Sequence, residues 1–224
     1  AMDAMTGKIL YDRAVDVQDC DTYVAAHNGK VLFLNNSGEK WWGGFGANAF
    51  KNNSIAVHDA LTGKFLWKRK CNYRFEPVIT DNTIYAEPWA FDLATGKRQR
   101  REHPITGAEG DFTWVRHDKQ CGGYSGSTHF LFGRNKGFGY HDVLRDHGMY
   151  QTWHHRQACD PDTSSGGGMM IKPPHAIGCK CEVSMPFTVA LAQVPQQPAV
   201  PQTFAQPGTE LPVRHLHLDL GQPP

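Results

Sequence analysis

Apolar residues recur at every second position in short runs along the first half of the chain, and turn-forming residues separate these runs. Ile55 and Val57 precede one such turn, and Phe65 and Trp67 follow it. A period of two is typical of β-strands, because successive side chains of a strand point to opposite faces of its sheet. The pattern predicts short strands joined by tight turns.

The predicted strands fall into blocks. Two blocks of four strands are expected, the first at 22–26, 30–34, 54–58 and 65–68, the second at 76–80, 83–87, 89–92 and 98–101. A third block is expected through 126–133 and 137–143, and a fourth through 166–172 and 187–192. Residues 1–12 supply only the last two strands of a block.

A turn sequence of the form D-x-x-T-G-K occurs three times, with intervals of 56 and 33 residues between copies. In such a turn the aspartate carboxylate accepts hydrogen bonds from the backbone that follows it, and the glycine adopts a positive φ. A repeat of about 33 to 45 residues with one long insertion fits the four-stranded blades of a β-propeller. The residues that define the repeat are Asp3, Gly7, Asp59, Gly63, Trp67, Asp92 and Gly96.

Residues 57–67 match the pattern A-x-D-x-x-T-G-K-x-x-W except for Val57 in the first place. This signature resembles the repeat of the pyrroloquinoline-quinone (PQQ)-like β-propeller proteins of bacteria, whose blades dock around a shared tryptophan. Tyr11 stands at the tryptophan position in the first copy and Arg100 in the third. The cysteine-containing part after residue 120 resembles the last blades of large exported proteins of this kind.

The resemblance implies an all-β fold, a small or incomplete propeller of about four to five four-stranded blades. We expect residues 1–193 to form the propeller and 194–224, which are rich in proline, to form a linker and the start of a further domain. Because a propeller closes to hide its sheet edges, the N-terminal strands are expected to complete the last blade, with an open arc as the alternative. The chain is expected to be an internal or truncated piece of a periplasmic or secreted protein.

The chain has 224 residues, with 23 Lys and Arg against 22 Asp and Glu. This balance gives no basic surplus to hold a phosphate backbone, so nucleic acid is not an expected partner. No apolar run approaches the roughly 20 residues that span a bilayer, and the first residues lack the pattern of a signal peptide. No membrane span is therefore expected.

Six cysteines leave two interpretations open. Their even number favours disulfides in an oxidising compartment, or buried thiols. The alternative is a thiolate metal site, although the C-x-C spacing lacks the paired C-x-x-C hairpins of common zinc modules. The candidates are Cys20, Cys71, Cys121, Cys159, Cys179 and Cys181.

Function in a propeller is expected at the central channel, where the first strand of each blade begins. Carboxylates precede several of these strands, and carboxylate oxygens suit Ca²⁺. The candidate Ca²⁺ ligands are Asp21, Glu76, Asp160 and Asp162, and Glu76 and Asp160 are also the catalytic candidates. Asp111 precedes another expected strand. The alternative is that these acids cap turns or pair with Arg74, Arg116 and Arg156.

Three functions follow from these features. The first is a non-enzymatic propeller module that binds a small molecule, a carbohydrate or a metal at its channel mouth. The second, by analogy with calcium-containing propeller lactonases and esterases, is a Ca²⁺-dependent hydrolase of esters or acyl lactones. The third is a remnant of a quinone-dependent dehydrogenase, although no motif matches the quinone-binding constellation and bound PQQ is not expected. Exchange of strands between two copies would give a homodimer.

Overall fold

The structure is a computed structural model. It describes residues 1–15, 21–36, 53–103, 105–116, 123–135, 137–146, 148–152, 163–172 and 188–192. Within these ranges every regular element is a β-strand and every strand pair is antiparallel. The all-β prediction is therefore confirmed, and the sheets are of the propeller-blade type described below.

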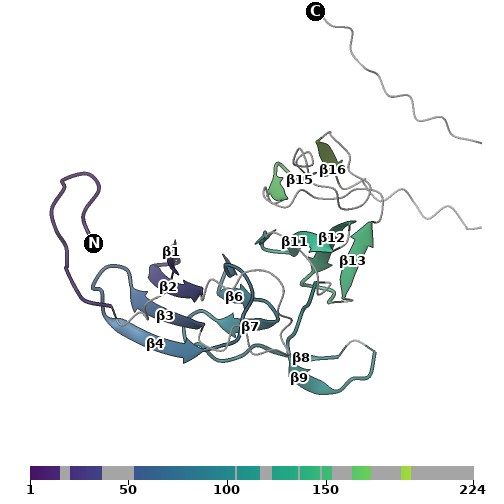
Figure 1. Ribbon diagram of the computed structural model, residues 1–224, viewed down its shortest axis with the longest axis horizontal. Coiled ribbons are helices and arrows are strands. Elements are labelled where there is room, and N and C mark those ends of the chain that lie inside the picture. The colour runs from purple at the N-terminus through teal and green to yellow at the C-terminus, as the bar shows by residue number, and fades with distance from the viewer. Residues whose placement is uncertain are drawn as a thin grey trace, which may run out of the picture. The chain divides into compact units, whose positions relative to one another are not determined.

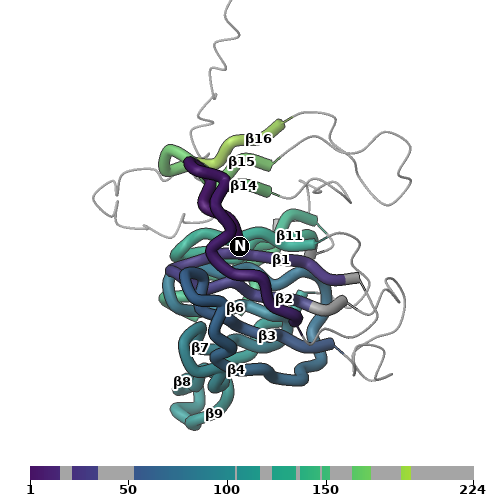
Figure 2. Tube along the Cα trace, turned by 90° about the vertical axis from the view of Figure 1, so that its left-hand side faces the viewer, coloured from purple at the N-terminus to yellow at the C-terminus, as the bar shows by residue number. Residues whose placement is uncertain are grey.

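The first sheet has the predicted four strands in the order in which they occur along the chain (Figure 1). They are β1 Asp21–His27, β2 Lys30–Asn36, β3 Ser54–Asp59 and β4 Phe65–Lys70. The tube trace shows the same strands side by side (Figure 2). Such a meander is expected because each strand is too short to do more than pair with its sequence neighbour.

The second sheet contains three strands where four were predicted. Its strands are β5 Val78–Thr80, β6 Thr83–Ala86 and β7 Trp89–Asp92. The strand expected at 98–101 pairs with β7 only through a bridge between Phe91 and Arg98. The chain then forms a hairpin that was not predicted, with β8 Arg100–Glu102 and β9 Glu109–Asp111.

The third and fourth sheets differ from the prediction at two of the expected strands. The third sheet is β10 Tyr124–Gly126, β11 Phe130–Asn135, β12 Gly137–Asp142 and β13 Met149–Thr152. The fourth is β14 Ser164–Gly166, β15 Met169–Lys172 and β16 Val189–Ala192. The strands expected at 126–133 and 166–172 are each interrupted by a tight turn. In the first stretch, Ser127 N–H donates to the Phe130 carbonyl at 2.8 Å. In the second, Gly167 and Gly168 have φ of +57° and +75°.

The N-terminal residues form a small hairpin with a bridge between Met2 and Ile9. Among the described residues this hairpin pairs with no strand of β14–β16, so closure of the last blade by the N-terminus stays a prediction. Residues 193–224 lie outside the described part, and the predicted linker stays a prediction as well.

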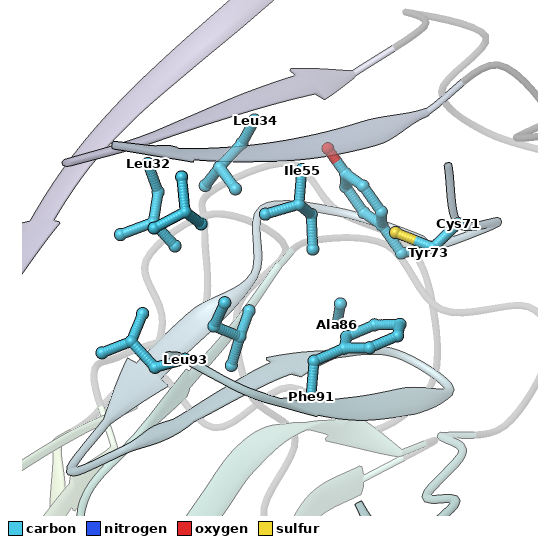
Figure 3. Packing of buried hydrophobic residues seen from close by; sticks show 10 residues of the cluster. Leu32, Leu34, Ile55, Cys71, Tyr73, Ala86, Phe91 and Leu93 are labelled. Atoms are coloured by element: carbon cyan, nitrogen blue, oxygen red, sulfur yellow. The ribbon is translucent and has the colours of Figure 1, made fainter. Parts of the chain in front are cut away.

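Apolar faces of the first two sheets pack against each other. Leu32, Leu34 and Ile55 extend from β2 and β3 toward Ala86 and Phe91 of the second sheet (Figure 3). Leu32, Ile55, Ala86 and Phe91 are fully buried. Burial of each large side chain among them, such as Leu32, Ile55 or Phe91, contributes about 1.5–3 kcal/mol, so this packing stabilises the pair of sheets.

The three repeated turns share one geometry. In the first, Asp3 Oδ1 accepts hydrogen bonds from the backbone N–H and the Oγ1 of Thr6, both at 2.8 Å, and Gly7 N–H donates to the Asp3 carbonyl at 2.8 Å. The turns at Asp59 and Asp92 repeat these bonds. Hydrogen bonds from the threonine hold the pKa of each aspartate below its ordinary value.

The first two repeats each dock an aromatic ring on the glycine of the next repeat. Trp67 lies so close to Gly96 that a Cβ built there would be 2.7 Å from the ring, and its Nε1 donates to the Leu93 carbonyl at 3.0 Å. Tyr11 takes the tryptophan position on Gly63, where a Cβ would be 2.5 Å from the ring. Substitution of Trp by Tyr in the first copy therefore preserves the contact.

These elements give the sheets two distinct ends. The D-x-x-T-G-K turns at Asp59 and Asp92 lie at the same end as the β1–β2 and β5–β6 turns, since Ala60 N–H donates to the Gly29 carbonyl and Leu93 N–H to the Asn82 carbonyl. We call this the turn end. The inner strands β1, β5, β10 and β14 begin at the opposite end, the strand-start end, where Glu76 precedes β5 and Asp21 begins β1.

Candidate functional site at the strand-start end

Glu76 is the one predicted Ca²⁺ ligand whose side chain the structure describes. It lies two residues before β5 and is half-buried. Asp21 begins β1, but its side chain lies outside the described part, as do Asp160 and Asp162 entirely. Within the described ranges no three His, Cys, Asp or Glu side chains come together to hold a metal ion. The described donors therefore do not by themselves form a Ca²⁺ site.

A fully buried ion pair between Glu87 and Arg116 lies at this end. Glu87 follows β6, and both side chains are completely shielded from solvent. Arg116 donates to Oε2 of Glu87 through Nε at 3.2 Å and Nη2 at 2.9 Å, and its backbone N–H donates to Oε1 at 2.8 Å. Three hydrogen bonds on one carboxylate compensate for the loss of water around both charges.

The sequence makes room for this pair through a glycine of the third sheet. A Cβ at Gly133 would lie 2.8 Å from Arg116 Cδ, so only glycine lets the arginine pass against β11. The remaining donor of the guanidinium, Nη1, reaches the Gly123 carbonyl at 2.5 Å, just before β10. Arg116 thereby ties the end of β6 to the start of β10.

Tyr124 completes the buried network from the first position of β10. Its hydroxyl donates to the Tyr85 carbonyl at 2.8 Å and accepts from the Glu87 backbone N–H at 3.2 Å. Burial raises the pKa of Tyr124 far above its ordinary value, so the phenol stays neutral and remains a donor. Its ring also contacts the Arg116 guanidinium, with 5.1 Å between Cζ and the ring centroid.

Phe75 has an unusual backbone in the loop before β5. Its φ is +61°, a left-handed conformation that bulky residues rarely adopt. Its ring contacts two guanidinium groups, with Cζ of Arg74 at 5.3 Å and Cζ of Arg116 at 5.0 Å from the centroid. Arg74 N–H also donates to the Glu87 carbonyl at 3.0 Å. These contacts fix Arg74 and Phe75, the two residues that precede Glu76, beside the buried pair.

A second polar group is buried where β14 begins. The β14–β15 register continues to place Thr163 opposite Lys172, and both residues are almost fully buried. Within the part of the chain that the structure describes, neither Thr163 Oγ1 nor Lys172 Nζ has a hydrogen-bond partner. The Ser125 hydroxyl donates to the Thr163 carbonyl, which ties β14 to β10. Burial lowers the pKa of Lys172 from its ordinary value.

Some of these residues were predicted from the sequence, but with other partners or positions than the structure gives them. Arg116 was expected as a partner for nearby acids, but its partner is Glu87, which carries no motif and was expected only as the last residue of a strand. Asp111 does not precede an inner strand. It lies in β9 and pairs with Arg98 at 2.8 Å and with Arg100 at 3.6 Å.

Cys71 is the one cysteine in the described ranges, and it is a buried free thiol. Burial raises its pKa to about 12, which favours the protonated thiol. The other five candidate cysteines lie outside the described part.

The sequence was compared with family models, curated proteins and solved structures. No family model matches the sequence, and no curated protein matches it either. Among solved structures, the chain is similar to BamB from Moraxella catarrhalis, with a TM-score of 0.47 and 12% sequence identity. The match covers 84% of this chain and 49% of that chain, so the sequence spans about half of the structure it matches. No helix in the described ranges is long and apolar enough to cross a bilayer.

Proposed function

We propose that this chain is a PQQ-like propeller module of an exported bacterial protein and that it binds a small polar ligand at its strand-start end. The observation that carries the proposal is the left-handed backbone of Phe75. Such a conformation costs about 1–3 kcal/mol in a non-glycine residue and is found preferentially at functional sites. Here it occurs directly before Glu76, beside the start of an inner strand.

Two further features support a ligand at this end. Glu76 stays partly accessible while its neighbours Arg74 and Glu87 are buried. Thr163, just before β14, and Lys172, at the end of β15, carry buried polar atoms without a hydrogen-bond partner among the described residues, and buried atoms of this kind usually have a partner. A carbohydrate or another small molecule with several oxygens would suit such donors and acceptors.

Ca²⁺ is the metal we propose for the same end, with Asp21, Glu76, Asp160 and Asp162 as its ligands. The described donors do not form this site alone, so the proposal depends on the carboxylates outside the described part. The hydrolase activity that a Ca²⁺ site would permit has no supporting observation among the described residues, and the binding module is therefore preferred.

Isothermal titration of the purified chain with Ca²⁺ and with a panel of oligosaccharides tests the proposal. We expect saturable binding that Glu76→Gln weakens at least tenfold. Glu109→Gln, which removes an exposed carboxylate from β9, is the matched control and should bind as the parent does. Equal binding by both variants, or no binding to any probe, would contradict the proposed site.

The same samples distinguish the enzymatic alternative. Cleavage of chromogenic esters or acyl lactones that a chelator abolishes and Ca²⁺ restores would replace the binding module by a hydrolase. Absence of turnover together with saturable binding would support the module.

A further inference from the structure

The tip of the β8–β9 hairpin repeats the backbone geometry of the D-x-x-T-G-K turns, with a histidine in place of the aspartate. The N–H of His103 donates to the Ala108 carbonyl, and the N–H of Gly107 donates to the His103 carbonyl, both at 2.9 Å. The turn at Asp59 has the same two bonds at the same positions, both also at 2.9 Å. The two turns therefore share one backbone conformation.

The side chain of His103 accepts the hydrogen bonds that a carboxylate accepts in the other copies. Its Nδ1 accepts from the backbone N–H groups of Ile105 and Thr106, at 3.2 Å each. In the turn at Asp59, Oδ1 accepts from the equivalent N–H groups of residues 61–62, at 3.2 and 2.8 Å. The position of the acceptor is thus the same in both turns, and its chemistry differs.

The two donors fix the protonation state of the His103 ring. A backbone N–H can only donate, so Nδ1 must carry a lone pair, and the proton of the neutral imidazole must be on Nε2. In a protonated histidine both ring nitrogens are donors. Protonated His103 therefore accepts neither hydrogen bond, and its Nδ1–H points at two backbone N–H groups that have lost their acceptor.

The two kinds of acceptor work over different ranges of pH. An aspartate side chain ordinarily loses its charge near about pH 4, whereas histidine is the side chain that ordinarily changes charge between about pH 5 and 8. Hydrogen bonds from Thr62 hold the pKa of Asp59 below even its ordinary value, so that carboxylate keeps accepting under mildly acidic conditions. Mild acidification therefore acts on the turn at His103 before it acts on the aspartate copies.

We propose that the turn at His103 is a pH-sensitive switch built into the fold, closed while His103 is neutral and opened by its protonation. The closed turn orders the tip of the hairpin, which presents Ile105 to solvent with 88% of its surface exposed. Opening releases the N–H groups of Ile105 and Thr106 to water and frees this apolar residue from its fixed position. The switch does not depend on the ligand site proposed at the strand-start end.

Other charged groups connect to the same hairpin. Those on its own strands are Arg100, Arg101, Glu102, Glu109 and Asp111. The carboxylates among them ordinarily titrate near about pH 4, below the range of histidine. From the third sheet, Asp146 pairs with Arg101 and lies 3.0 Å from Nε2 of His141. His141 is therefore a second histidine connected to the hairpin, and the experiment must distinguish it from His103.

Amide hydrogen exchange measured by NMR from about pH 7.5 to about pH 5, and corrected for the intrinsic pH dependence of exchange, tests the proposal. Protection of the Ile105 and Thr106 amides should fall about fivefold as His103 becomes protonated, which is the ratio expected for the loss of one ordinary hydrogen bond. The amides of residues 61–62 are the internal control, because their acceptor is a carboxylate, and they should keep their protection. The ring resonances of His103 in the same titration give the pH of the change.

Three variants assign the response to its residue. His103→Asp restores the acceptor of the other copies, so the turn should stay closed and the Ile105 and Thr106 amides should lose their pH response. His103→Ala removes the acceptor, and both amides should be weakly protected at every pH. His141→Gln should leave the response of the turn unchanged. Constant protection of the two amides in the parent chain, parent-like protection in His103→Ala, or a response that His103→Asp retains would overturn the proposal.

Discussion

Glu87 and Arg116 show how the chain carries charge in its interior. Each group would be strongly unfavourable alone in a low-dielectric environment, and each is stabilised by the hydrogen bonds of the other. Removal of one partner leaves the second charge buried without compensation, so the two residues are far more sensitive to substitution than an exposed ion pair.

We therefore expect Glu87→Gln to lower the free energy of unfolding by about 3–5 kcal/mol. The exposed pair of Arg98 and Asp111 is the control, since Asp111→Asn should cost no more than about 1 kcal/mol. Urea unfolding followed by tryptophan fluorescence measures both. Similar small losses in the two variants would show that Glu87 is not paired in the interior.

His141 links stability to pH. It is buried on β12, its Nε2 lies 3.0 Å from Asp146 Oδ1, and Phe112 contacts its ring edge-on. Asp146 also pairs with Arg101, and Arg101 donates to the Thr113 carbonyl at 3.2 Å. Desolvation lowers the pKa of His141 despite the nearby carboxylate of Asp146.

Because the folded protein favours neutral His141, its contribution to stability is complete above the unfolded pKa of about 6.5. It is lost as the pH falls from there through the lowered folded pKa. We expect the thermal midpoint to decrease between pH 7.5 and pH 5, and His141→Gln to reduce this decrease. An unchanged pH dependence in the variant would assign the effect to other groups.

At the scale of elements, the repeated turn is the unit that sequence predicts best. Its hydrogen bonds all lie within six residues, so Asp3, Asp59 and Asp92 identify it without any knowledge of the rest of the fold. A fourth copy was missed because His103 replaces the aspartate and accepts from Ile105 and Thr106 through Nδ1, at 3.2 Å each.

The β12–β13 turn was missed for a similar reason. Asp142 accepts from the backbone N–H of Leu144 and Arg145, but Asp146, with φ of +52°, takes the place of the glycine. The geometry is conserved between copies while the residue types change, and a search for residue types cannot detect it.

Two glycines of the repeat differ in what surrounds them, so the cost of a left-handed backbone can be measured apart from the cost of a clash with a ring. Gly7 and Gly96 have φ of +69° and +66°, but a Cβ meets nothing within 4 Å at Gly7 and the Trp67 ring at Gly96. We expect Gly7→Ala to cost about 1–2 kcal/mol for the left-handed backbone alone. Gly96→Ala should cost at least about 1 kcal/mol more, because the ring must move. Chemical denaturation of both variants measures the difference, and equal costs would contradict the docking of Trp67.

At the scale of the whole molecule, contacts between sheets were the least predictable part. The strands of the first sheet followed from alternation, but the hairpin β8–β9 did not, since Arg100, Arg101 and Glu102 show no apolar period. The strand-start end depends on residues distant in sequence, such as Glu87 and Arg116, whose pairing leaves no local pattern. Glu76 was identified only because its place before an inner strand could be deduced from the repeat.

Successive repeats form propeller-type sheets, and an aromatic ring of one repeat packs on a glycine of the next. The most direct test is a nuclear Overhauser measurement between the Trp67 indole and the Gly96 α-protons, with the Tyr11 ring and Gly63 as the second pair. We predict strong contacts in both pairs and upfield-shifted glycine α-protons that Trp67→Leu returns to ordinary values at Gly96 only. Absence of both contacts in the folded chain would contradict the arrangement of the repeats.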